Sequence, residues 1–460
     1  MRHHFFTKRG WGLLLASAVC LLAAGVMGRR DLLTLAVLLL VLPLVSLAGV
    51  RLLKPSFTVY REFTPQSVET GATTTVRLAV AKSGSGSGHT LMEERLPHRF
   101  GQSPVFRFPA RSASGGTSRY EYHLRSARRG QYVVGPVTAE FTDPFGMSLH
   151  RHTIDDGDAL TVTPAAVELP ATGLAGARGN DGVTATRTRA NPSEDDVMTR
   201  EYRHGDPMRR VHWAATARHG TLMVRQEESV TTPEATIILD HRHMAFPEAP
   251  APGMTEPDQP LSNRCFEWTV VAAMSISAHL MERNYSLRCL DPVGEAAFRR
   301  SPSAPEPEAE EFSGTAGLQS IADSLAAIGL TGHHRPAMRE AAAGQEHGPA
   351  VFTDELMDKL SAHRMRGPLV ALLGRISPAE ARSLAAGAGY GANAFALLVT
   401  ESPAECQDAL EILRLGGWHA TAITPSTSVQ EAWSNFDADA PGGAQAPAAV
   451  DVRRGAEVAR

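Results

Sequence analysis

The chain has 460 residues, of which 43% are hydrophobic and 20% charged, a composition typical of a globular protein of two or three domains with an added membrane segment. The formal net charge of -4 excludes a polycation that binds nucleic acid over its whole surface. The four cysteines form no metal-binding spacing; Cys20 falls in the first apolar run, and the other three predict small buried side chains in a reducing compartment.

Two apolar runs predict a transmembrane hairpin within residues 1–54. The runs cover residues 11–27 and 32–50, contain no ionisable side chain, and would span roughly 26 and 28 Å as helices, close to the roughly 30 Å of a bilayer core. Basic residues flank both outer ends, although the turn also holds two arginines. The positive-inside rule favours a multi-pass plasma-membrane protein whose large C-terminal part is cytoplasmic. The alternative is that the first run is a cleaved signal peptide.

Residues 55–165 predict a β-sandwich of immunoglobulin-like type. Four stretches alternate between apolar and polar residues, and turn residues separate them. A distinctive run contains Arg128-Arg129-Gly130, Gly135-Pro136-Val137 and Asp143-Pro144-Phe145-Gly146. By itself this run indicates two tight turns around a strand.

Residues 166–232 hold a connecting loop and then a dense polar segment, residues 199–228, which we call the signature segment. Aromatic and aliphatic residues interleave with its arginines and histidines, so the polar groups need a specific fold to satisfy them. The candidate interaction residues in this segment are Tyr202, Arg203, Gly205, Asp206, Arg209, Arg210, His212, Trp213 and Arg218.

Residues 233–436 predict an α/β domain with a mostly parallel sheet, because short buried strands alternate with helical stretches. Residues 301–313 are rich in proline and glutamate and predict a flexible insertion. Residues 437–460 are rich in alanine, glycine and proline and predict a disordered tail.

The motifs of this chain resemble those of the family called domain of unknown function 58. The upstream run and the two apolar helices fit the family's pattern. In the signature segment the matching elements are Glu201-Tyr202-Arg203-His204-Gly205-Asp206, Arg209-Arg210-Val211-His212-Trp213 and Ala217-Arg218. The resemblance implies a membrane-anchored protein with a von Willebrand A-like domain, typically encoded beside a MoxR-type ATPase. It implies no established activity.

Ligands of such α/β folds bind at the carboxyl ends of strands, and Asp240 follows the first predicted strand. The usual metal site of a von Willebrand A-like fold is Asp-x-Ser-x-Ser, but Arg242 and Met244 replace both serines here. An arginine in an oxygen-rich shell would repel Mg²⁺. We therefore expect no metal and no cofactor, with Asp240 as a degenerate remnant that pairs with a nearby arginine.

Three interpretations of the signature segment stay open. It is a hydrogen-bonded network that fastens the β region to the α/β domain, a docking surface for a protein partner, or a catalytic set of Asp206, His212 and Thr216. Acidic residues interrupt its positive charge and disfavour nucleic-acid binding.

For the whole chain, the leading hypothesis is a non-enzymatic, membrane-anchored scaffold or adaptor. It would recruit a protein partner, a MoxR-type ATPase by family context, in envelope assembly or protein maturation. One alternative is a hydrolase that uses the region of Asp206 and His212. The other is a binding protein whose β region faces the cell envelope.

Overall fold

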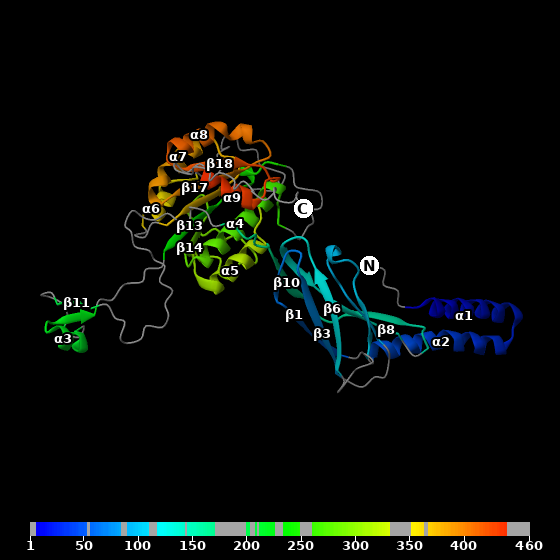
Figure 1. Cartoon of the computed structure of the whole chain (residues 1–460). Coiled ribbons are helices and arrows are strands. Elements are labelled where there is room, and N and C mark those ends of the chain that lie inside the picture. Colours follow the sequence, from blue (N-terminus) through cyan, green and yellow to red (C-terminus); the bar gives the residue numbers. More distant parts are fainter. Residues whose placement is uncertain are drawn as a thin grey trace, which may run out of the picture.

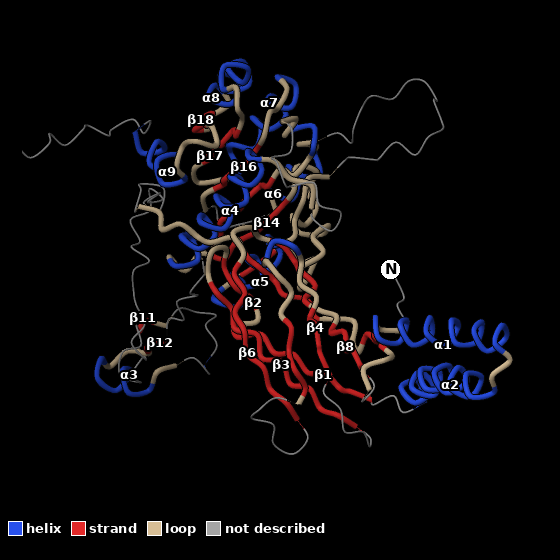
Figure 2. The backbone as a smooth tube through the Cα atoms, turned by 90° about the vertical axis from the view of Figure 1, so that its right-hand side faces the viewer, coloured by secondary structure: helices blue, strands red, loops and turns tan. Residues whose placement is uncertain are grey.

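The computed structural model describes residues 6–52, 56–83, 90–109, 117–142, 145–170, 199–202, 208, 211–225, 233–248, 260–331, 351–362 and 367–438. These residues form a helical hairpin, a group of β-sheets that we call the β module, an α/β domain, and a small lobe from the signature segment (Figures 1 and 2). The β module lies between the hairpin and the α/β domain (Figure 1).

The hairpin consists of α1 (Lys8–Met27) and α2 (Arg30–Leu52), and both helices are long and apolar enough to cross a membrane. The buried residues of the hairpin include the small residues Ser17, Ala24 and Ala36. Because these side chains are small, the two helix backbones can approach closely. The hydroxyl of Ser17 donates to the carbonyl oxygen of Ala36 at 2.7 Å. The predicted pair of apolar helices joined by a tight turn is confirmed.

The β module contains three sheets, with orders β1-β3-β6, β2-β10-β7 and β5-β4-β8-β9, in which every neighbouring pair is antiparallel except β2 with β10. The strands are β1 (Ser56–Thr64), β2 (Ser67–Glu69), β3 (Thr73–Ser83), β4 (Thr90–Glu94), β5 (Val105–Phe108), β6 (Thr117–Arg125), β7 (Gly130–Val134), β8 (Val137–Thr142), β9 (Leu149–Thr153) and β10 (Asp158–Thr163). The four stretches predicted as strands are confirmed as β1, β3, β6 and the pair β7 and β8.

One face of β3 holds these sheets together. Val76 packs in a buried cluster with Leu160 of β10, while Leu78 packs in a second cluster with Met92 of β4. Because alternate residues of a strand point to the same face, β3 buries one side against both of the other sheets.

Strands β7 and β8 form one continuous path through the module, which we call the strut (residues 130–142). An extended chain of this length spans up to roughly 40 Å. The path changes sheets at Gly135, whose φ of 103° favours glycine. A Cβ atom at Gly135 would lie 2.7 Å from the Cα atom of Gly157 and 2.8 Å from Nη2 of Arg61, so no larger residue fits.

Arg61 of β1 is buried beside this bend and is surrounded by carboxylates. Its Nε donates to Glu94 at 2.5 Å, Nη1 to Asp158 at 2.6 Å and Nη2 to Asp155 at 3.0 Å. Asp155 also accepts the backbone N–H of Val137 at 2.6 Å. The guanidinium therefore ties β1, β4 and the turn before β10 to the middle of the strut.

The α/β domain is built on the strand order β15-β14-β13-β16-β17-β18, parallel throughout except for the edge strand β15. Its elements are β13 (Glu234–Leu239), α4 (Arg264–Glu282), β14 (Ser286–Leu290), β15 (Glu311–Phe312), α5 (Gly314–Ala326), α6 (Asp354–Ser361), β16 (Leu369–Leu373), α7 (Pro378–Ala385), β17 (Ala394–Val399), α8 (Gln407–Leu415), β18 (His419–Ile423) and α9 (Val429–Ala438). The predicted α/β domain with a mostly parallel sheet is confirmed.

The central strands are apolar on both faces because helices cover both faces. On β16, Val370 and Leu372 join the core of α4, α5 and α9, whereas Ala371 and Leu373 join that of α6, α7 and α8. Continuous apolar runs of this kind are typical of parallel strands buried on both sides.

The prediction of a flexible insertion at residues 301–313 is wrong. The hydroxyls of Ser301 and Ser303 donate to the carbonyl oxygens of Ser324 and Asp323, both at 2.5 Å, and Phe312 is buried in β15. Composition indicated disorder because these hydrogen-bond partners lie far along the chain. Helix α6 was not predicted, and α9 runs past the boundary expected at residue 436. Residues 439–460 of the predicted tail lie outside the described residues.

The Arg61 cluster yields a stability prediction. Arg61→Ala should lower the free energy of unfolding of the β module by about 3–5 kcal/mol, because it leaves Glu94 buried without its cation. The measurement is denaturant unfolding of the detergent-solubilised chain. The matched control is Arg77→Ala on β3, whose pair with Glu121 is 3.6 Å long and mostly exposed, and which should cost less than about 1 kcal/mol. Equal losses in the two variants would contradict the role of Arg61.

Candidate functional site

The signature segment forms the small lobe in which β11 (Thr199–Glu201) pairs antiparallel with β12 (Met223–Arg225), with α3 (Trp213–His219) between them. Of the candidate residues, the structure describes Tyr202, His212, Trp213 and Arg218. Five others, Arg203, Gly205, Asp206, Arg209 and Arg210, lie outside the described residues.

His212 and Thr216 serve the backbone of this lobe. Nδ1 of His212 accepts the N–H of Ala215 at 3.0 Å and so caps the start of α3. The hydroxyl of Thr216 donates to the carbonyl oxygen of His212 and accepts the N–H of Met223, both at 3.0 Å. This geometry gives both side chains a structural task and adds no support to the hydrolase hypothesis.

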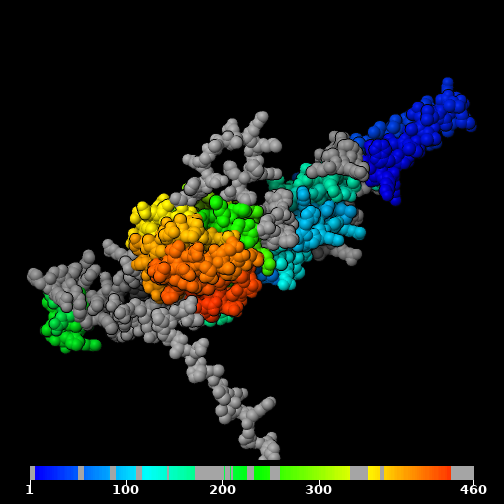
Figure 3. Space-filling view, turned by 90° about the horizontal axis from the view of Figure 1, so that it is seen from above, coloured from blue at the N-terminus to red at the C-terminus, as the bar shows by residue number. Residues whose placement is uncertain are grey.

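The lobe buries a small core and turns a large aromatic residue outward. Val211 and Val224 are buried, whereas the indole of Trp213 is 65% exposed, and Met208 and Leu222 are exposed as well. In Figures 1 and 3 the lobe (green) stands apart from the sheets of the β module and the α/β domain, away from the blue hairpin. An exposed tryptophan with apolar neighbours is the kind of group that anchors protein interfaces.

At the carboxyl edge of the parallel sheet, Asp240 forms an ion pair with Arg242. Nε and Nη2 of Arg242 donate to its two carboxylate oxygens at 3.0 and 2.8 Å, and Nη1 donates to Glu380 at 2.5 Å. Burial alone lowers the pKa of Arg242, but these two carboxylates outweigh it and raise the pKa above its ordinary value. The arginine that pairs with Asp240 comes from the same turn. Among the described residues, no group of three His, Cys, Asp or Glu side chains is placed to hold a metal ion.

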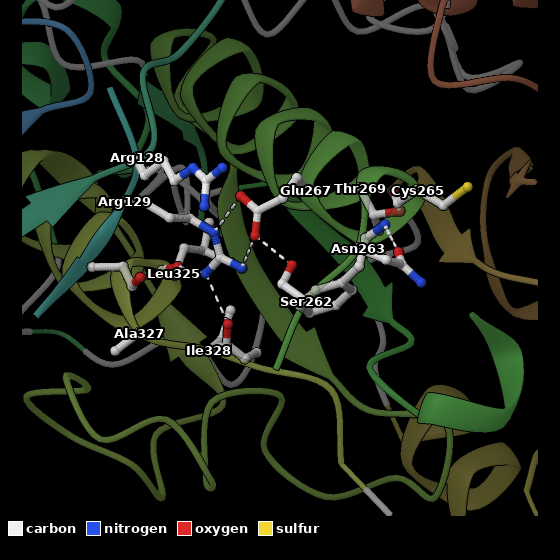
Figure 4. Close-up of polar contacts among 12 residues, drawn as sticks. Arg128, Arg129, Ser262, Asn263, Cys265, Glu267, Thr269, Leu325, Ala327 and Ile328 are labelled. Atoms are coloured by element: carbon white, nitrogen blue, oxygen red, sulfur yellow. Dashed lines mark hydrogen bonds and ion pairs between the residues drawn. The ribbon is translucent and has the colours of Figure 1, made fainter. Parts of the chain in front are cut away.

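The most extensive polar contact between the β module and the α/β domain is made by Arg129, the residue before the strut (Figure 4). Its Nε and Nη2 form a fork on the carboxylate of Glu267 in α4, at 3.0 and 2.9 Å. Its Nη1 reaches the carbonyl oxygens of Leu325 at 2.5 Å, Ile328 at 2.8 Å and Ala326 at 3.3 Å. The last carbonyls of a helix lack partners within the helix and attract cations, so Arg129 caps the end of α5.

We call this contact, Arg129 with Glu267 and the end of α5, the arginine joint. Further hydrogen bonds surround it, including Ser67 to Asp323 at 2.8 Å and the N–H of Val167 to Ser275 at 2.9 Å. Arg129 was expected only to belong to a tight turn; its long-range partners gave no local signal. A fastening role for the signature segment stays a prediction.

Glu267 remains charged in the joint. Burial by itself raises its pKa, but the charge of Arg129 and the hydrogen bonds from Arg129 and Ser262 outweigh this effect and lower the pKa. The ion pair therefore stabilises the joint above the ordinary pKa of a glutamate and loses that contribution only as the pH falls through the lowered value.

The far end of the strut leads to a turn that contacts both helices of the hairpin. The N–H of Thr7 donates to the carbonyl oxygen of Met147 at 2.9 Å, and its hydroxyl donates to that of Gly146 at 2.6 Å. The hydroxyls of Ser46 in α2 and Ser148 lie 3.1 Å apart. The strut therefore joins a contact with the hairpin to a contact with the α/β domain.

Replacement of Arg129 should separate the β module from the α/β domain. Arg129→Ala should weaken the joint by about 2–4 kcal/mol, below the full cost of breaking a buried pair because the Glu267 side chain is 29% exposed. Arg129→Lys should fail to restore it, because a point charge cannot replace the planar fork. The measurement is hydrogen exchange in the last turn of α5. Arg77→Ala on β3, an exposed arginine that pairs with Glu121 of the β module, is the control and should leave exchange unchanged; equal exchange in both variants would contradict the assignment.

Docking of the two parts through the joint should be lost in strong acid but not at mildly acidic pH. Docking should persist from pH 8 to about pH 5 and weaken only below about pH 4, because the lowered pKa of Glu267 delays its protonation. Energy transfer between fluorophores on the β module and the α/β domain measures this. Glu267→Gln should remove the pH-dependent step, and undocking of the unaltered chain between pH 5 and 7 would contradict it.

Comparisons with known proteins touch a limited part of the chain. Among curated proteins, none matches the sequence. A solved structure, the Pseudomonas fluorescens alkylpurine DNA glycosylase AlkC bound to DNA containing an abasic site analog, is 12% identical over 29% of this chain and 38% of that chain. Its TM-score of 0.14 carries no argument about fold or function.

One family model matches the signature segment and the start of the α/β domain. Residues 198–245 match the model described as "Protein of unknown function DUF58", so this stretch is similar to that family.

Proposed function

We propose that the chain is a membrane-anchored adaptor that presents the signature lobe to a protein partner. The hairpin anchors it in the plasma membrane, and the basic residues at the outer ends of the hairpin favour a cytoplasmic β module and α/β domain. We further propose that the β module is an immunoglobulin-like sandwich and that the α/β domain is von Willebrand A-like, in keeping with the family resemblance.

The construction of the molecule suits such a role. The turn that follows the strut contacts the hairpin and Arg129, which precedes the strut, makes the arginine joint, so a partner bound by the distal parts would be held near the membrane. At the sheet edge, where α/β folds place ligands, Arg242 already covers the carboxylate of Asp240. This occupied edge makes binding of a protein a better-supported role than chemistry on a small molecule.

The observation that carries the proposal is the exposed indole of Trp213 on the lobe. Tryptophan and arginine dominate the binding energy of many protein interfaces, and Arg218 lies in the last turn of the helix that Trp213 begins. The partner that we propose, on the family resemblance alone, is a MoxR-type ATPase, and the proposed process is envelope assembly or protein maturation.

A capture experiment tests this proposal. The detergent-solubilised chain should recover a specific ATPase in the presence of ATP or a non-hydrolysable analogue. Trp213→Ala should weaken capture by about 2 kcal/mol, or roughly thirty-fold in Kd, without lowering the melting temperature, because the indole is exposed.

The matched control is Tyr60→Ala on β1, because Tyr60 is 67% exposed and Trp213 is 65% exposed. This variant should capture the partner normally. Recovery of no ATPase, or an equal loss of capture in both variants, would contradict the proposal. Labelling of cysteines introduced in the β module from outside intact cells would instead favour the envelope-facing alternative.

A further inference from the structure

The turn after the strut, residues 145–148, lies against the open end of the hairpin, where α1 begins and α2 ends. It contacts Thr7, which caps the start of α1, and Ser46 of α2. Ser46 is not at the end of the apolar run but about 6 Å before it, at 1.5 Å per residue up to Val50. If the hairpin spans the bilayer, this turn lies beside the membrane interface.

The turn and the hairpin are in close contact. Ser148 is fully buried between the strand and the helices, and Met147 is nearly so. A side chain on Gly10 of α1 would collide with the carbonyl oxygen of Met147, so the glycine permits the backbone of the turn to lie directly on the helix.

Phe145, the first residue of this turn, is 68% exposed beside these buried neighbours. Trp11, in the first turn of α1, is also exposed and packs edge-to-face on Phe6 with ring centres 6.0 Å apart. Aromatic side chains at this level match the belt that membrane proteins place at the boundary between hydrocarbon and headgroups. Lys8 and Arg9 supply cations at the same level, where phosphate groups lie.

We propose that the turn at residues 145–148 is a third membrane-contacting element, in which Phe145 inserts among the phospholipid acyl chains at the bilayer interface. The inference rests on the proposed anchoring by the hairpin. The lipid surface is the occupant that the geometry favours, because the turn lies directly against Gly10 of α1 and Ser46 of α2, and Phe145 is exposed beside these contacts with the hairpin. With the hairpin contacts, this third point sets the angle of the strut to the membrane.

Photo-crosslinking to lipid tests the inference. The full chain carrying p-benzoylphenylalanine in place of Phe145 is reconstituted in vesicles of phosphatidylcholine and phosphatidylglycerol, irradiated, and analysed for lipid adducts by mass spectrometry. The same photoprobe at Leu22 of the hairpin is the positive control. Probes at Val133 on the strut and at Leu415 on α8, both exposed, are the negative controls.

We expect adduct formation at position 145 to be comparable with that at Leu22 and at least several-fold above that at Val133 and Leu415. Lipid adducts at Leu22 but not at 145, or a crosslink from 145 to a second copy of the chain, would overturn the inference and leave the anchoring intact. Adducts at neither position would overturn the anchoring as well. An unchanged melting temperature of the 145 variant shows that the probe reports on the folded protein.

Discussion

The arginine joint is the constraint on which the arrangement of this protein depends. Its guanidinium satisfies one carboxylate and the carbonyl oxygens at the end of a helix, and these groups come from two separate elements of the α/β domain. A planar group with five donors can meet such a set at once, whereas an ammonium cannot. Arg129 directly precedes the strut. The contacts that fix the strut within the β module therefore also fix the position of the α/β domain.

The strut is itself held along its length by contacts of different kinds. At its bend, Arg61 pulls three carboxylates together around Gly135, and at its far end the turn lies against the hairpin. Arginine thus recurs as an internal cation, at the bend, at the joint and on Asp240. The ion pair with Arg242 balances the charge of Asp240 at the sheet edge of the α/β domain. The side chain of Trp213, by contrast, is exposed on the signature lobe.

Periodicity predicted most of the elements because their patterns are local. The apolar runs of the hairpin, the alternation in β1 and β3, and the buried strands of the parallel sheet all carried their own signal. The functional geometry was harder to predict because it depends on distant partners. Arg129 pairs with a residue in α4, and Ser301 and Ser303 are ordered by α5, so neither the joint nor the order of residues 301–313 follows from local composition. The run Arg129-Gly130, Gly135-Pro136 and Phe145-Gly146 marks the start of the strut, its bend and the turn that follows it. Its turns alone did not reveal what they contact.

A distance measurement across the joint tests the central claim, that the strut holds the β module and the α/β domain in one fixed arrangement. Spin labels on cysteines introduced at the exposed positions Tyr60 and Leu415 would report the separation of the two parts by pulsed electron resonance in the full, membrane-reconstituted chain. A single narrow distance that broadens when Arg129 is replaced by alanine is the predicted result. A broad or multiple distribution in the unaltered chain would contradict the account.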